Sequence, residues 1–94
     1  MSVKYEVKFT NQFKKDFKLI KKRGKQVEKL FEVVAKLANG EPLEPKYNDH
    51  ELVGNYKGYR ECHIEPDWLL IYVIRNDVLV LTLNRTGSHA DLFK

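Results

Sequence analysis

The three histidines of the chain are its side chains best suited to chemistry near neutral pH. His50, His63 and His89 are the only histidines present, and each lies in a polar, turn-like stretch of the C-terminal half. Imidazole is the one side chain whose ordinary pKa lets it accept or release a proton near pH 7. Together with Asp67 and Arg85, these residues supply the acids, bases and cation that metal-free cleavage of a phosphodiester requires.

The phosphodiester that such a set could cleave is that of RNA. A general base would remove the proton of the 2′-hydroxyl, a general acid would protonate the departing 5′-oxygen, and a cation would stabilise the phosphorane. Arg85 suits the last task, because a guanidinium donates two hydrogen bonds to phosphate oxygens and stays charged. Trp68 and Phe93 offer flat rings on which an unpaired base could stack.

The same side chains could instead have purely structural roles. A histidine or aspartate in a loop often orders a turn, a tryptophan usually packs in the core, and an arginine commonly closes an ion pair. For His63, such a role would be pairing with Glu61 or Glu65. The functional interpretation therefore depends on whether the fold brings the whole set together: His50, His63, Asp67, Trp68, Arg85, His89 and Phe93.

Periodicity in the first half of the chain predicts one strand and two helices. Residues 3–10 alternate apolar and polar side chains, as a half-buried strand does. From Asn11 the apolar residues recur at helical spacing until Arg23-Gly24, and a second helical pattern runs from Val27 to a stop at Gly40. A long connecting segment with two prolines follows at residues 41–55.

The second half predicts three strands and a short helix. The strands are expected at residues 59–65, 68–75 and 78–84, with turns at Pro66-Asp67 and Asn76-Asp77. Ser88 could cap a final helix that ends near Phe93. The order strand, helix, helix, strand, strand, strand indicates the α+β class, with an antiparallel hairpin sheet and both long helices packed on one of its faces.

The register of the hairpins predicts which residues share a face. If each turn holds two residues, Trp68 lies opposite Arg85, and His63 lies opposite Leu70. Because opposed residues point to the same side, His63, Trp68 and Arg85 would project together near one end of the sheet. The residues expected on the other face, beneath the helices, are Cys62, Ile64, Leu69, Ile71 and Val73.

Composition and charge limit the class of protein. A chain of 94 residues with 43% hydrophobic and 32% charged residues suffices for one globular domain, here residues 1–94. Residues 1–40 carry eleven Lys or Arg against four Asp or Glu, and residues 41–94 carry six against nine. Such a basic region favours a polyanionic partner, either RNA or an acidic protein segment, although a solvated helix surface would have the same composition.

Cysteine usage and hydropathy bear on the compartment. The single Cys62 cannot form an internal disulfide, which favours a reducing compartment, the cytoplasm. The longest apolar runs, residues 69–74 and 78–81, are too short to cross a bilayer, so no membrane partner is expected. The N-terminal residues do not resemble a signal peptide.

Three segments resemble the YafQ-like branch of the RelE/ParE toxin superfamily. They are residues 49–52, 56–72 and 85–93, and the resemblance extends over nearly the whole chain, including the two helices. A hairpin of the pattern His-x-x-Pro-Asp-Trp, followed by Arg-Thr-Gly-Ser-His and a terminal Leu-Phe, is fairly specific. The resemblance implies a RelE-like fold and a toxin of a type II toxin-antitoxin pair, silenced by a cognate antitoxin protein.

The resemblance also implies an activity and roles for residues. The implied activity is that of an mRNA interferase, a metal-independent endoribonuclease that cuts messenger RNA, typically on the translating ribosome, without a cofactor. His50 or Asp67 would act as base, His89 as acid and His63 as orienting or proton-sharing group, with Arg85 at the phosphate and Trp68 and Phe93 near the bases. The lysine-rich helices would face ribosomal RNA or lie beneath the antitoxin.

Three other classes of function stay open from the sequence. A metal hydrolase could use histidines and an aspartate, but their spacing matches no HExxH or paired-ligand motif. A toxin of the ParE type, which acts on DNA gyrase without cleaving RNA, could share the fold, although those relatives generally lack such a histidine-rich set. A non-catalytic RNA-binding module would bind RNA and yield no cleavage product.

Overall fold

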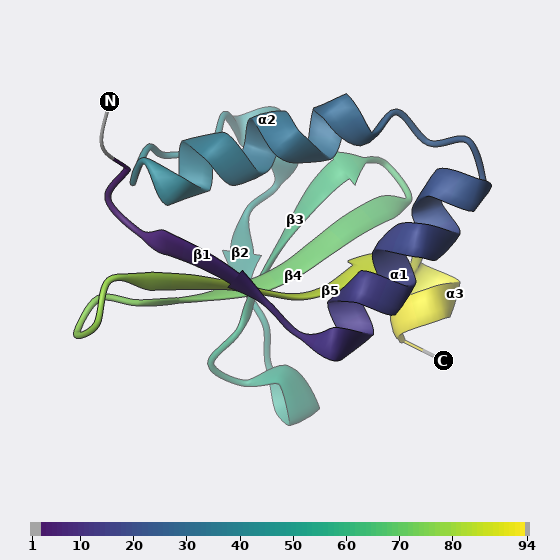
Figure 1. Ribbon diagram of the computed structural model, residues 1–94. Coiled ribbons are helices and arrows are strands. Elements are labelled where there is room, and N and C mark those ends of the chain that lie inside the picture. Colours follow the sequence, from purple (N-terminus) through teal and green to yellow (C-terminus); the bar gives the residue numbers. More distant parts are fainter. Residues whose placement is uncertain (1–2, 94) are drawn as a thin grey trace.

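The chain folds into a five-stranded sheet with two long helices on one face, as shown by the computed structural model, which describes residues 3–93 (Figure 1). In chain order the elements are β1 (Glu6–Phe9), α1 (Asn11–Lys22), α2 (Val27–Ala38), β2 (His50–Glu51), β3 (Arg60–Glu65), β4 (Trp68–Arg75), β5 (Val80–Gly87) and α3 (His89–Leu92). The predicted α+β class and order are confirmed, and the predicted connecting segment contains the short strand β2. Two 3-10 turns flank β2, η1 (Pro45–Tyr47) and η2 (Gly54–Tyr56).

The strands lie in the order β1-β5-β4-β3-β2. β1 pairs with β5 in parallel, whereas the other neighbours are antiparallel. A parallel pair needs a long crossover, and α1 and α2 belong to the chain that links β1 to the rest of the sheet. β1 and β2 are therefore the two edges of the sheet, and the histidine-bearing strands β2 and β3 lie far from β1.

The helices are attached to the sheet by a cap and by their apolar faces. The Thr10 side chain accepts a hydrogen bond from the Phe13 backbone N–H (3.0 Å) and donates one to the Asn84 carbonyl (2.8 Å), which fixes the start of α1 against β5. Both helices then turn buried apolar residues toward the sheet, among them Phe13, Ile20, Leu30, Val33 and Leu37. None of the helices within residues 3–93 has an apolar run long enough for crossing a membrane.

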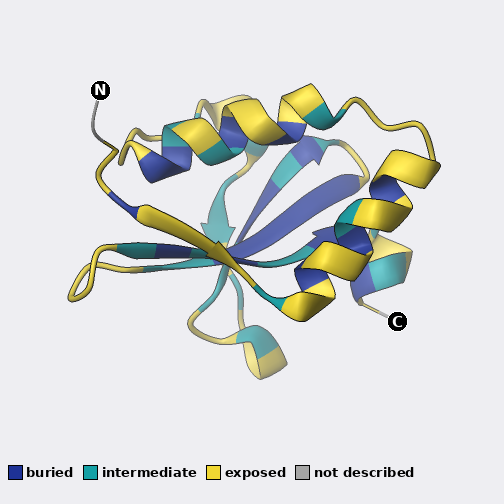
Figure 2. Ribbon diagram, in the orientation of Figure 1, coloured by how far each residue is buried: buried dark blue, intermediate teal, exposed yellow. Residues whose placement is uncertain are grey.

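Two apolar clusters lie on opposite faces of the sheet. Beneath α1 and α2, the main cluster includes Cys62, Trp68, Leu70 and Tyr72. Figure 2 shows in dark blue the buried stretches of the central strands and of the two helices. The other face carries a smaller cluster of Leu69, Ile71 and Leu92, with Leu52, Tyr56 and Tyr59 packed against it. The second face is thus covered by apolar residues of the 52–59 segment and by Leu92 of α3.

The β3–β4 hairpin differs from the predicted register. Glu65 lies opposite Trp68, as predicted. A bulge follows, and His63 lies opposite Leu69 instead of Leu70. Because a shift of one residue moves a side chain to the other face, Trp68 projects beneath the helices while His63 projects from the opposite face. The prediction that these two side chains share a face is wrong.

The β4–β5 hairpin differs as well. Residues 76–79 form its connection, which is two residues longer than predicted. A second irregularity in β5 then sets Arg85 opposite Ile71 instead of Trp68. Leu69 and Ile71 face away from the helices, not toward them as predicted. Arg85 nevertheless projects from the same face as His63. The bulge in β3 and the irregularity in β5 are each a shift of one residue relative to β4, so they move both side chains to the same face.

Candidate functional site

The fold brings the three histidines into one row. The ring centroids of His50 and His63 are 6.4 Å apart, and those of His63 and His89 are 5.8 Å apart. The residues come from β2, β3 and the start of α3, so three elements separated in sequence meet at this end of the sheet. His63 lies between the other two, so three imidazoles are presented in sequence at this end of the sheet.

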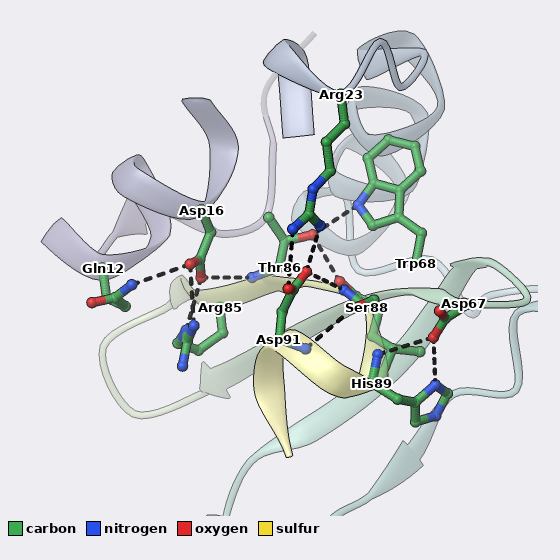
Figure 3. A network of polar contacts seen from close by, with 11 residues as sticks. Gln12, Asp16, Arg23, Asp67, Trp68, Arg85, Thr86, Ser88, His89 and Asp91 are labelled. Atoms are coloured by element: carbon green, nitrogen blue, oxygen red, sulfur yellow. Dashed lines mark hydrogen bonds and ion pairs between the residues drawn. The ribbon is translucent and has the colours of Figure 1, made fainter. Parts of the chain in front are cut away.

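His89 is held by Asp67, which lies in the β3–β4 turn (Figure 3). The Asp67 Oδ1 accepts hydrogen bonds from the His89 backbone N–H (2.9 Å) and from the His89 Nδ1 (2.8 Å). These bonds hold the pKa of Asp67 below its ordinary value, the backbone N–H contributing most, so the carboxylate is ionised near neutral pH. Because a carboxylate can only accept, Nδ1 carries the proton, and Nε2 of this 55% exposed ring is presented for proton transfer.

His50 and His63 share a different pattern. The His50 Nδ1 donates to the Asn48 carbonyl (2.6 Å), and the His63 Nδ1 donates to the Pro66 carbonyl (3.3 Å). Carbonyl oxygens only accept, so both Nδ1 atoms carry protons and both Nε2 atoms remain for chemistry. Each Nε2 lies near the same oxygen of Glu61, at 3.4 Å for His50 and 3.6 Å for His63.

Glu61 is a site residue to which sequence reasoning gave only a structural role. It lies on β3 two residues before His63 and therefore on the same face, and it is 4% exposed. A buried carboxylate between two imidazoles would share any proton that either Nε2 carries. The alternative partner, Glu65, instead pairs with Lys25 (3.1 Å) and Lys29 (2.9 Å). The spacing of two residues on a predicted strand was the signal for Glu61.

Arg85 is fixed by Asp16 of α1. The Arg85 Nε and Nη2 donate to the Asp16 carboxylate at 2.8 and 3.2 Å, which raises the pKa of Arg85 further above its ordinary value. The Thr86 backbone N–H donates to the same carboxylate (3.1 Å). The ion pair considered from sequence is thus present, and it leaves other N–H groups of the guanidinium for a phosphate. Asp16 itself was missed, although an aspartate within the apolar stripe of a helix was a signal.

The two aromatic residues predicted to stack on bases differ in exposure. Trp68 is fully buried, and its Nε1 donates to the Thr86 Oγ1 (3.0 Å), so its ring belongs to the core and the predicted stacking role is wrong. Phe93 is 41% exposed, with its ring centroid 6.2 Å from that of His89 and 5.6 Å from that of Tyr56. Its role near a base stays a prediction.

Helix α3, which carries His89, is tied to α1 by an ion pair. Asp91 accepts hydrogen bonds from Arg23 (2.6 Å) and from the Ser88 backbone N–H (2.9 Å), and it closes a capping box with Ser88. These contacts, that with Arg23 first, hold the pKa of Asp91 far below its ordinary value. The folded state therefore gains stability from ionised Asp91 above the unfolded-state pKa of about 4, and loses it as the pH falls through the folded-state pKa.

The Asp91→Asn variant is expected to be less sensitive to acid than the wild type. The introduced amide would keep an acceptor for the Ser88 N–H but lose the charge that pairs with Arg23, at a cost of about 1 kcal/mol near neutral pH, because the pair is partly exposed. Urea unfolding at about pH 6 and about pH 2 would measure the difference. Equal stability losses on acidification in both proteins would contradict this assignment.

Within residues 3–93, no group of three or more His, Cys, Asp or Glu side chains is arranged to hold a metal ion. The Nδ1 atoms of all three histidines instead donate hydrogen bonds to a carbonyl or a carboxylate oxygen.

Comparison with known proteins gives a consistent family. Residues 5–94 match the family described as bacterial toxin of type II toxin-antitoxin system, YafQ. The mRNA interferase toxin YafQ of Escherichia coli K12 is 42% identical over 92 residues, which cover 97% of this chain and 98% of the relative. The E. coli DinJ-YafQ toxin-antitoxin complex contains a chain with a TM-score of 0.88 and 42% identity, covering 97% of this chain and 99% of the other. A metal-bound toxin from Helicobacter pylori has a TM-score of 0.89 at 44% identity, with 95% and 99% of the two chains covered.

Proposed function

The chain belongs to the YafQ family of toxins from type II toxin-antitoxin systems, and on that premise we propose that its histidine row is the catalytic centre of an endoribonuclease. As a member of this family it is an mRNA interferase, a toxin that acts on messenger RNA. The observation that carries the proposal is the meeting of His50, His63 and His89 on one face, with Asp67 fixing His89.

The contacts of the row support distinct roles for its two ends. Asp67 is bound twice to His89, so it orients the ring and balances the charge of its protonated form rather than serving as a separate base. His89 is then the general acid that protonates the 5′-oxygen, and His50 is the general base for the 2′-hydroxyl. His63 lies between them, which suits in-line displacement, because attacking and leaving oxygens lie on opposite sides of the phosphorus.

Charge at the phosphate is the remaining requirement. Arg85 supplies it with the guanidinium N–H groups that Asp16 does not use. Glu61 positions His50 and His63 and exchanges protons with them. No step in this scheme needs a metal, and Phe93 beside His89 offers a face to a base on the leaving-group side. Because the substrate is messenger RNA, the proposed place of action is the cytoplasm. We propose that cleavage takes place on messenger RNA bound to translating ribosomes.

Cleavage of a defined messenger RNA tests the proposal. Purified protein would be added with and without programmed ribosomes, and EDTA would be included in the ribosome-free arm. The expected cuts leave 5′-hydroxyl ends, and a single 2′-deoxynucleotide at a cut position abolishes that cut alone, because the 2′-hydroxyl is the nucleophile. Cuts that survive 2′-deoxy substitution would refute the mechanism, and cuts that need metal without ribosomes would refute its metal independence.

A cognate antitoxin is the protein partner of the toxin, and we also propose where it docks. An apolar groove of about 410 Å³ lies between β1, α1 and α2, lined by Val7, Phe9, Phe13, Phe17, Leu30, Phe31, Val34 and Leu83. Phe9 and Phe31 are 51% and 54% exposed there. For Phe9 this differs from the prediction that the strand at residues 3–10 buries its apolar face. Lys14 and Lys18 rim the groove, so the complementary occupant is an antitoxin segment with apolar residues and acidic neighbours.

Replacing Phe31 by aspartate is expected to weaken antitoxin binding by about 30-fold, since an exposed aromatic anchor is worth about 2 kcal/mol at an interface. RNA cleavage without antitoxin should persist, because the groove lies on the helix side of the sheet. Val78→Asp is the matched control, as Val78 is 55% exposed and outside the groove. Isothermal titration with the antitoxin would measure both variants, and equal affinities would contradict the docking site.

A further inference from the structure

A second cavity opens directly beside the histidine row. It has a volume of about 400 Å³ and lies between α2, η1 and the β3–β4 turn, where its walls are Lys29, Glu32, Lys46, Tyr47, Asn48, His63, Ile64, Glu65 and Pro66. Cavities of this size hold small ligands, and a single nucleotide is of that order. Of the row, only His63 lines the cavity, and neither His89 nor Phe93 contributes to it.

Two contacts connect the cavity to the reacting groups. His63, in the middle of the row, is one of the residues that line it. Asn48 also lines it, and the Asn48 carbonyl accepts the hydrogen bond from the His50 Nδ1. A molecule seated in the cavity therefore lies next to His63 and next to Asn48, the residue that holds the His50 ring, and not next to His89. His50 is the proposed base and His89 the proposed acid. A nucleotide on the His50 side of the row would therefore lie on the 5′ side of the cleaved bond.

The chemistry of the walls suits a ribonucleotide. Lys46 forms no ion pair within residues 3–93, and its ammonium lies 5.2 Å from the Tyr47 ring centroid, exposed for a phosphate. Lys29 and Lys25 together hold the Glu65 carboxylate, so Lys46 is the lining lysine whose charge no described carboxylate pairs. Glu32 and Asn48 offer acceptors and a donor to a base edge. A cavity with mixed polar and apolar walls and one ammonium that forms no ion pair among residues 3–93 fits a nucleotide better than a purely apolar ligand.

We propose that this cavity binds the nucleotide on the 5′ side of the cleaved bond, the one whose 2′-hydroxyl is the nucleophile. The proposal rests on the function proposed above, since His50 as base must lie beside that hydroxyl. Lys46 contacts the phosphate that precedes this nucleotide, and Glu32 with Asn48 faces its base. The cavity thereby selects the base upstream of the cut, whereas Phe93 contacts the downstream side.

Steady-state cleavage on programmed ribosomes tests the role of Lys46. Lys46→Glu is expected to raise KM by about 10-fold with kcat nearly unchanged, because the contact binds substrate without touching the reacting atoms. Glu32→Gln is expected to change the base preference at the upstream position alone. Lys8→Glu is the matched control, as Lys8 is an exposed lysine on β1 at the opposite edge of the sheet. Circular dichroism would check that all three variants fold.

Photo-cross-linking places the nucleotide directly. A messenger RNA with 2′-deoxy-4-thiouridine on the 5′ side of the cut cannot be cleaved, and it should cross-link to residues 46–48. The same probe on the 3′ side should cross-link near Phe93 instead. The subsite proposal fails if Lys46→Glu has the same KM as Lys8→Glu and the upstream probe cross-links elsewhere. If the wild-type protein still cleaves RNA in that case, the proposed nuclease function stands. If wild-type protein makes no cut, both proposals fail.

Discussion

The His89→Ala variant is expected to cleave messenger RNA about 10²- to 10⁴-fold more slowly than the wild type, the range that a positioned general acid contributes. Asp67 holds the His89 ring by two hydrogen bonds, so Nε2 is aimed without further rearrangement. Without the imidazole, the departing 5′-oxygen leaves as an alkoxide or takes its proton from water. Single-turnover cleavage on programmed ribosomes would measure the loss in kcat, which KM should not share.

A structural explanation of such a loss is excluded by the exposure of His89. Its side chain is 55% exposed, and truncation removes no core contact, so the unfolding free energy should change by no more than about 1 kcal/mol. The Asp67→Asn variant refines the test. It keeps the shape of the turn but loses the charge that stabilises protonated His89, so it should retain more activity than His89→Ala. Full activity in the His89 variant would remove the residue from the mechanism.

The sequence predicted the element order well because its patterns are local. The turn at Pro66-Asp67 between β3 and β4, helical spacing in α1 and α2, and Ser88 as the cap of α3 each depend on a few neighbouring residues. Local propensity and turn chemistry agreed with the fold at these points. The meeting of the three histidines was a condition of the functional interpretation and was not predicted by local patterns, because the short strand β2 that carries His50 lies in the predicted connecting segment.

Register was the limit of sequence reasoning. The two irregularities, near Ile64 and near Asn84, each insert one residue into a strand, and no local pattern marks them. They decide that Trp68 is a core residue and that His63 faces the site. Glu61 and Asp16 were undervalued for a related reason: their function depends on partners that are distant in sequence, and only the folded sheet brings these within hydrogen-bond distance.

Asp16→Ala is expected to destabilise the protein by about 3 kcal/mol, because it removes the common acceptor of a nearly buried network. The Asp16 side chain, 9% exposed, accepts hydrogen bonds from Arg85, from the Thr86 backbone N–H and from Gln12. Without it, the Thr86 N–H lacks its partner and the Arg85 guanidinium lacks its counter-charge. Since Thr86 also binds the Trp68 Nε1, the loss reaches the core.

Urea unfolding would measure the destabilisation, with Gln12→Ala as the control. Gln12 belongs to the same network but is exposed, so its removal should cost less than about 0.5 kcal/mol. Cleavage under conditions where Asp16→Ala stays folded adds a second readout: if Asp16 orients Arg85 toward the phosphate, kcat falls even in the folded fraction. A variant as stable and as active as the wild type would show that Arg85 needs no partner, and that the ion pair contributes neither to folding nor to the charge of the site.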